Sequence, residues 1–155
     1  MTPAITLLTK KRIKHKVLKY EHDASASSYG LEAVEKLQLD ANCVFKTLVV
    51  STDKGTLAVA IVPVNNKLSE KKMAKALGTK KVVMAKSEDV ITSTGYVLGG
   101  VSPLGQKKRL TTVIHDSAEA LSAIYVSAGK RGLELSLSPT SLSMLTQAAF
   151  ADITA

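Results

Sequence analysis

"VFKTLVVSTDKGTLAVAIVPV", residues 44–64, contains two apolar runs, 44–51 and 56–64, on either side of the polar sequence TDKG, which ends in Gly55. A short polar segment with glycine between two β-branched runs is typical of a β-hairpin. The runs show little alternation of polar and apolar residues. We therefore expect both strands of the hairpin to be largely buried.

Helix-like and strand-like segments alternate around this hairpin. Caps and apolar spacing predict helices that start at Thr2-Pro3, at 29–37, between Ser69 and Gly78, at 87–95, and from Ser138-Pro139 to 149. Further strands are predicted at 16–20, 80–85, 111–115, 124–128 and 133–137. This mixture predicts an α/β (mixed α+β) fold with a mixed, strongly curved sheet and surrounding helices.

The bulk composition limits the kind of protein. A chain of 155 residues with 45% hydrophobic content suits one compact domain over residues 1–155. No run of 18 apolar residues is present and the N-terminus lacks the order of a secretory signal, so we expect a soluble cytoplasmic protein without membrane contact. Cys43 is the single cysteine and the three histidines are scattered, which predicts neither a disulfide nor a metal site, and we expect no cofactor.

The charge distribution indicates an anionic partner. The net charge is +8, and residues 67–86 contain seven lysines but one acid, Glu70. Helical spacing places Lys71, Lys72 and Lys75 on one exposed arc. Aromatic residues make up only 4% of the chain, so an RNA partner would be held by its backbone more than by its bases.

Two segments could carry chemistry, and each leaves alternatives open. Lys46 lies among aliphatic residues, so it either sits at an exposed strand end or points into a pocket. In "STGYVLGGVSPLGQKKR", residues 93–109, the pair Gly99-Gly100 is either a simple turn or a place where the backbone approaches a ligand. The following Lys107, Lys108 and Arg109 are either a solvated face or a phosphate contact.

Two other polar residues are weaker candidates. Ser127 lies in "YVSAGKRG", residues 125–132, outside any nucleophile elbow, which favours a hydrogen-bonding or turn role. Tyr20 ends a predicted strand and is either a core or rim residue or part of a site.

Taken together, "FKTLVV", "STGYVLGGVSPLGQKKR" and "IYVSAGKRGLEL" resemble the YbaK/EbsC family of aminoacyl-tRNA editing proteins, from "MTPAITLL" to "FADI". The resemblance is strongest to the Cys-tRNA(Pro) deacylases. It implies a barrel-like sheet related to the editing domain of bacterial prolyl-tRNA synthetases, with aminoacylated tRNA and prolyl-tRNA synthetase as partners. It also implies hydrolytic removal of cysteine from Cys-tRNA(Pro), or also from Cys-tRNA(Cys), by attack of the substrate's own thiol on its ester to give a thiolactone.

The same resemblance assigns roles to single residues. Lys46 and Gly99 would act at the scissile ester. The substrate pocket would further include Tyr20, Tyr29, Gly100, Ser127 and Glu134. Contacts with tRNA phosphates would come from Lys71, Lys72, Lys75, Lys107, Lys108 and Arg109.

The chain departs from the family pattern at three positions, which bears on the shape of the pocket. Glu134 falls where relatives often have aspartate, Tyr29 where they often have phenylalanine, and Ala128 where glycine is common. The sequence leaves two alternative functions open beside the leading one: an Ala-tRNA(Pro) deacylase of the same superfamily that uses water as nucleophile, and a non-catalytic module that binds aminoacyl-tRNA.

Overall fold

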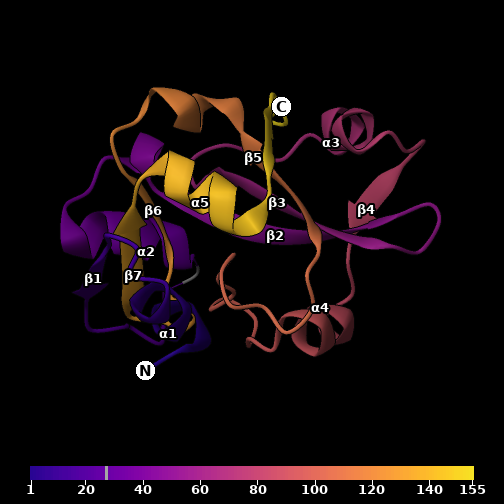
Figure 1. The fold of residues 1–155 in the computed structure, drawn as a ribbon. Helices are drawn as coiled ribbons and strands as arrows, with labels where there is room; N and C mark the ends of the chain where they lie inside the picture. Colours follow the sequence, from indigo (N-terminus) through magenta and orange to yellow (C-terminus); the bar gives the residue numbers. More distant parts are fainter. Residues whose placement is uncertain (27) are drawn as a thin grey trace.

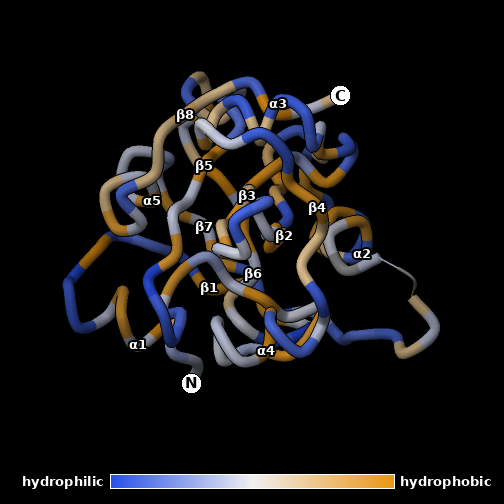
Figure 2. Tube along the Cα trace, turned by 90° about the vertical axis from the view of Figure 1, so that its right-hand side faces the viewer, coloured by the Kyte–Doolittle hydropathy of each residue, from blue (hydrophilic) through white to orange (hydrophobic). Residues whose placement is uncertain are grey.

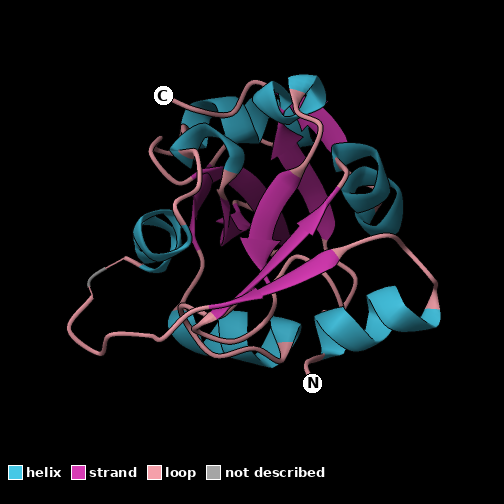
Figure 3. Cartoon of the chain, turned by 90° about the vertical axis from the view of Figure 1, so that its left-hand side faces the viewer, coloured by secondary structure: helices cyan, strands magenta, loops and turns pink. Residues whose placement is uncertain are grey.

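The structure is a computed structural model that describes residues 1–26 and 28–155, without the side chain of Tyr29 (Figure 1). The helices are α1 (Pro3–Lys10), α2 (Tyr29–Leu37), α3 (Glu70–Leu77), α4 (Ser87–Thr94) and α5 (Pro139–Thr146), with short 3₁₀ turns η1 (Ala41–Cys43) and η2 (Asp116–Ala120). The strands are β1 (Lys16–Lys19), β2 (Phe45–Thr52), β3 (Leu57–Pro63), β4 (Val82–Met84), β5 (Thr111–His115), β6 (Ile124–Ser127), β7 (Leu133–Leu137) and β8 (Ala149–Ala151). The strands lie in the middle of the molecule and the helices around them (Figure 3).

The predicted hairpin is confirmed and forms the centre of a five-stranded sheet. The strand order is β4-β2-β3-β5-β8. β2 and β3 pair antiparallel from Phe45 opposite Pro63 to Ser51 opposite Leu57, whereas β5 is parallel to both β3 and β8. The predicted mixed sheet is therefore confirmed.

The expected barrel-like closure is wrong, because the strands form two open sheets. The second sheet has three strands in the order β1-β7-β6, all antiparallel. One isolated bridge, Val44 to Tyr125, joins the two sheets in the described part of the chain. A barrel requires an unbroken ladder of hydrogen bonds around the sheet, and a single bridge does not provide one.

Both faces of the hairpin are buried, as its composition predicts. Phe45, Val49, Val59 and Ile61 face a core shared with α1, α5 and the three-stranded sheet. The neighbouring residues of each strand face a second core against α3 and β4: Val50, Ala58, Ala60 and Val62. Figure 2 shows the apolar β3 running through the middle of the molecule.

Local capping signals locate most helix ends correctly. The Ser69 hydroxyl accepts a hydrogen bond from the Lys72 N–H, and Gly78 ends α3 in the left-handed conformation. The predicted end of the last helix at 149 is wrong: α5 ends at Thr146, and residues 149–151 pair with β5 instead. Within the described residues, no helix combines the length and apolar character that crossing a lipid bilayer requires.

Removing side-chain volume from the centre of the hairpin tests this packing. Ile61 is fully buried, so Ile61→Ala should lower the free energy of unfolding by about 3 kcal/mol through lost burial and the cavity left behind. Met144→Ala, at a position 62% exposed on α5, should change it by less than about 0.5 kcal/mol. Urea unfolding followed by circular dichroism measures both, and equal midpoints would contradict the packing described.

Candidate active site

The open edge of β2 forms one side of a pocket. β2 pairs with β3 along its length, but β4 reaches it only at Val50–Thr52. The Val44 carbonyl accepts from the Val64 N–H, so the even-numbered residues of β2 bond to β3 and the odd-numbered ones face away from it. The N–H and C=O of Thr47 thus face the open edge, beside a cavity of about 370 Å³.

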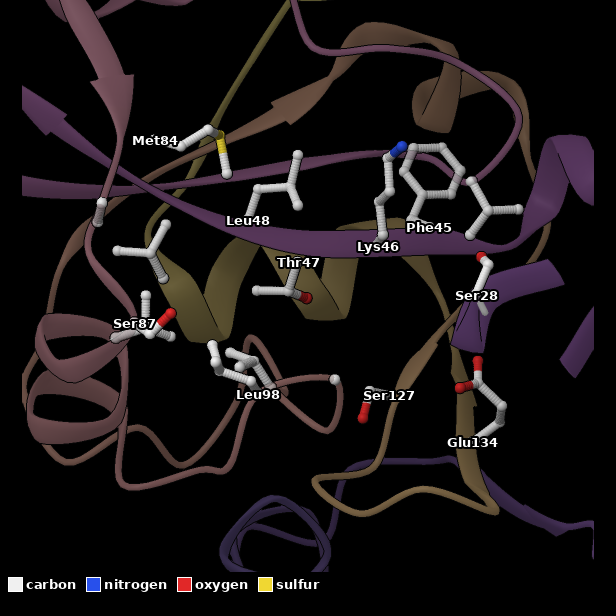
Figure 4. A pocket seen from close by; sticks show the side chains of 17 residues that line it. Ser28, Phe45, Lys46, Thr47, Leu48, Met84, Ser87, Leu98, Ser127 and Glu134 are labelled. Atoms are coloured by element: carbon white, nitrogen blue, oxygen red, sulfur yellow. The ribbon is translucent and has the colours of Figure 1, made fainter. Parts of the chain in front are cut away.

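Neighbouring residues of β2 reach this pocket from opposite faces of the strand. In Figure 4 the Lys46 side chain and the Thr47 hydroxyl lie on opposite sides of β2, and Ser127 and Glu134 lie on the Thr47 side. Lys46, Gly99, Ser127 and Glu134 all line the cavity, so the structure brings these predicted site residues together. Burial lowers the pKa of the Lys46 ammonium, and the nearby charge of Lys67 lowers it further.

The glycine-rich loop presents a backbone donor to the pocket. The Gly100 N–H donates to the Val97 carbonyl at 3.0 Å, and Gly99 has φ of 82°, as in a type II turn that requires glycine at its third position. The Gly99 N–H has no acceptor among the described residues. Gly99 therefore lines the pocket and has a backbone donor that no described residue uses.

Gly100 packs against a neighbouring turn and does not line the pocket. A β-carbon at Gly100 would lie 3.3 Å from the Lys130 Cα, so the loop at 97–100 packs backbone to backbone on the turn at 128–132. The Thr2 hydroxyl donates to the Ala128 carbonyl at the start of that turn. The two glycine-rich segments thus support each other from behind the site.

Glu134 is a buried acid with a carboxyl oxygen that no described residue satisfies. Its side chain belongs to β7, the residue is 6% exposed, and Oε2 has no partner among the described residues. Burial raises the pKa of Glu134 to about 8. Ser127 lies close in the same pocket, where its Oγ accepts from the Gly129 N–H at 3.1 Å.

Thr47 is a pocket residue that the sequence reasoning missed. Its Oγ1 is buried and, like Glu134 Oε2, has no partner in the described part of the chain. Strand alternation next to Lys46 could have located it, because adjacent residues of a strand point to opposite faces.

The two predicted tyrosines are not shown in the pocket. Tyr20 follows β1, where its N–H donates to the Gly132 carbonyl at 3.0 Å, and it is not one of the residues that line the cavity. Burial raises the pKa of Tyr20, and the nearby carboxylate of Glu134 adds to the effect. Tyr29 is the first residue of α2, and its side chain lies outside the described structure.

A second buried glutamate, also missed from the sequence, ties the surrounding segments together. Glu32 of α2 accepts hydrogen bonds from His22 Nδ1 at 2.6 Å and from the Asp23 N–H at 2.8 Å. Arg131 Nη1 lies 2.6 Å from His22 Nε2, and since guanidinium only donates, His22 accepts there and carries its proton on Nδ1. Burial alone would raise the pKa of Glu32, but the hydrogen bonds from His22 and Asp23 hold it below its usual value.

The predicted RNA-binding residues form two separate groups. The first group belongs to α3 and consists of Lys71, Lys72 and Lys75. The second group lies beside the end of α4, where the backbone N–H groups of Lys107 and Lys108 donate to carbonyls of the helix, and Arg109 follows them in the chain. Figures 1 and 2 place α3 and α4 at opposite ends of the molecule. Lys72 also pairs with Asp152 at 2.9 Å, which offsets its charge.

The pocket therefore offers one cation, one free backbone N–H and several oxygen acceptors on an apolar wall. Such groups can orient an ester and stabilise charge that develops on it. No three His, Cys, Asp or Glu side chains in the described segments lie close enough together to hold a metal ion.

The titration of Glu134 predicts a pH-dependent stability. Because the folded-state pKa of about 8 lies above the ordinary value of 4.5, the folded protein keeps a proton that the unfolded chain releases between these values. The free energy of unfolding should therefore fall as pH rises from about 5 to about 8, by up to ~1.4 kcal/mol per pH unit. Glu134→Gln removes this loss.

Urea unfolding at pH 5, 6, 7 and 8 checks this prediction. The stability advantage of Glu134→Gln over the parent protein should grow with pH, whereas Glu119→Gln, an exposed position in η2, should show none. A constant difference between Glu134→Gln and the parent across the range would contradict it.

Comparisons with known proteins identify the family of the chain. Residues 24–145 match the family model described as the aminoacyl-tRNA editing domain. The chain is 40% identical over 154 residues to the Enterococcus faecalis protein named "Putative Cys-tRNA(Pro)/Cys-tRNA(Cys) deacylase EbsC", which covers 99% of this chain and 93% of that protein. It is also 40% identical over 76 residues to a proline–tRNA ligase from Shouchella clausii, covering 49% of this chain and 13% of the ligase.

A solved structure shows the same fold. It is described as "Crystal structure of a putative trans-editing enzyme for prolyl tRNA synthetase", and it superposes with a TM-score of 0.84 at 23% identity over 100% of this chain and 98% of that chain. The matched family model and the nearly full-length relative confirm the resemblance that the sequence motifs indicate. The chain belongs to the aminoacyl-tRNA editing domain family.

Proposed function

We propose that the protein is a trans-editing deacylase that clears cysteine from Cys-tRNA(Pro), and also from Cys-tRNA(Cys). Aminoacyl-tRNA editing is the activity of the family, and the name of the Enterococcus faecalis relative specifies cysteine esters. The observation that carries the proposal is that Lys46 and Gly99, from distant parts of the chain, line one pocket of a size suited to a small ligand.

The reaction that suits this pocket uses the substrate's own thiol. The cysteine sulfur bonds to the ester carbonyl carbon, the bond from that carbon to the ribose oxygen breaks, and the thiol proton passes to the departing oxygen. The products are tRNA and a thiolactone, which water then opens. An intramolecular nucleophile has an effective concentration of roughly 10⁵ M or more when it is well oriented, so the enzyme need supply little beyond orientation and charge stabilisation.

Lys46 and Gly99 supply that stabilisation in our proposal. The free Gly99 N–H would donate to the carbonyl oxygen as it gains negative charge, in the manner of an oxyanion hole. The Lys46 ammonium, on the other face of β2, would hold the terminal adenosine end of the tRNA and favour the same anionic transition state through its charge.

The tRNA would approach from the α4 side of the pocket. Ser87 and Val90 of α4 line the cavity, and the segment with Lys107, Lys108 and Arg109 is hydrogen-bonded to the end of the same helix. This segment is therefore a better candidate for contacts with the acceptor-stem phosphates than α3. Contacts with phosphates do not distinguish one base sequence from another, so we propose that prolyl-tRNA synthetase shares in tRNA selection. We further propose that this protein and the synthetase act in the cytoplasm.

Three charged tRNAs test the chemistry. tRNA(Pro) carrying cysteine should be deacylated at least ~100-fold faster than tRNA(Pro) carrying serine, because a hydroxyl is a far weaker nucleophile than a thiol. Acid-gel or thin-layer assays of the remaining ester give the rates for cysteine, serine and alanine. Equal rates on cysteine and alanine would instead establish an Ala-tRNA(Pro) deacylase that uses water.

Lys46→Ala separates an enzyme from a binding module. The variant should lose ~100-fold or more of the deacylation rate, while its affinity for tRNA(Pro) stays within about threefold because one cation among many is removed. Lys54→Ala, in the exposed turn of the same hairpin, is the matched control and should retain activity. If the parent protein leaves Cys-tRNA untouched, a non-catalytic aminoacyl-tRNA binding module becomes the better account.

A further inference from the structure

Three oxygen-bearing side chains on one side of β2 have hydrogen-bonding capacity left over. Glu134 Oε2 and Thr47 Oγ1 are buried and have no partner among the described residues. Ser127 Oγ accepts one hydrogen bond, from the Gly129 N–H, and retains a further lone pair. All three residues line the same cavity, and Figure 4 shows them on the side of β2 opposite the Lys46 ammonium.

The described surroundings of Glu134 offer no counter-charge to an ionised carboxylate. The same cavity is lined by apolar side chains, including Phe45, Val49 and Val101. None of the ion pairs in the described structure includes Glu134, and the neighbouring Arg131 is engaged with His22. A buried carboxyl group that lacks a hydrogen bond or counter-charge in the described structure destabilises the fold, so a ligand that supplies the missing partner would be held strongly there.

We propose that Glu134, Thr47 and Ser127 together bind the α-ammonium group of the aminoacyl ester. An ammonium group has three N–H donors for the three oxygens and a positive charge that the buried carboxylate lacks. The thiol is a weak donor, and the ribose hydroxyls carry no charge. This inference rests on the proposed function, because it places one further group of the same substrate.

The protonation of Glu134 is consistent with this assignment. In the empty pocket, burial raises its pKa to about 8, so the carboxyl group keeps its proton at neutral pH. An incoming ammonium group would take the place of that proton as the positive partner, and the proton would be released to solvent. The pocket would then prefer aminoacyl esters with a free amino group over N-acylated ones, such as formylated or peptidyl esters, which are uncharged at nitrogen.

Non-hydrolysable analogues test the assignment without turnover. The probes are 3′-(L-cysteinylamino)-3′-deoxyadenosine and its N-acetyl derivative, titrated under reducing conditions and followed by NMR. The parent protein should bind the free-amino analogue ~30-fold or more tightly than the N-acetyl analogue, since a buried charge pair is lost with the second. Free L-cysteine serves as a third probe, and weak binding of it would show that the amino group is recognised only as part of an aminoacylated nucleoside.

Two variants test which side chains cause the preference for the free-amino analogue over the N-acetyl analogue. Glu134→Gln keeps the side-chain shape and should reduce the ratio of the two affinities to about threefold or less, while Thr47→Val should reduce it by about fivefold through loss of one acceptor. Glu119→Gln, the same chemical change at the exposed position, should leave the ratio unchanged.

Equal binding of the two analogues by the parent protein, no binding of the free-amino analogue, or an unchanged ratio in Glu134→Gln would overturn the assignment. Deacylation of Cys-tRNA(Pro) is measured separately on the same proteins. If the analogues behave as expected but Cys-tRNA(Pro) is not deacylated, the proposed function fails and the ammonium site stands. If Cys-tRNA(Pro) is deacylated but the analogues show no amino-group preference, the proposed function stands and the ammonium site fails.

Discussion

Burial of the β2–β3 hairpin on both faces is the constraint on which the rest of the structure depends. Alternate residues of each strand fill two different cores. A shift of the β2–β3 pairing by one residue would exchange the two sets and turn Lys46 toward the core shared with α1, α5 and the three-stranded sheet. The register therefore fixes Lys46 on one face and Thr47 on the other. Since β4 covers only the far end of β2, the remaining edge stays open and the pocket forms there.

Features that depend on local sequence could be predicted, and features that depend on distant pairing could not. The hairpin and the caps at Ser69 and Gly78 follow from a few adjacent residues. The strand at 149–151 depends on a parallel partner far back in the chain, and His22 contacts Arg131 across 109 residues. No local pattern contains such pairs. The resemblance to a family supplied Lys46, Gly99 and Glu134. Strand alternation would place Thr47 on the face opposite Lys46, but its unpartnered buried oxygen becomes visible in the structure.

Two buried glutamates differ in their hydrogen-bonding partners, and this difference separates a structural residue from a candidate binding residue. Glu32 and Glu134 are equally hidden from solvent, at 6% exposure each. Glu32 is satisfied by His22 and by a backbone N–H, which keeps its pKa low and makes it a structural anchor for the pocket's rim. Glu134 Oε2 has no such partner in the described part of the chain, burial raises the pKa of the carboxyl group, and its burial costs stability. Unsatisfied groups of this kind are characteristic of sites that complete their hydrogen bonding with a ligand.

The first strand and the first helix lie outside residues 24–145, the span that matches the family model. Yet β1 pairs with β7 so that Leu18 lies opposite Glu134, and Thr2 holds the carbonyl of Ala128. An evolutionary boundary drawn at residue 24 would thus divide a sheet and not a linker. A module cut at that residue would leave the edge of β7, the strand that carries Glu134, without its β1 partner.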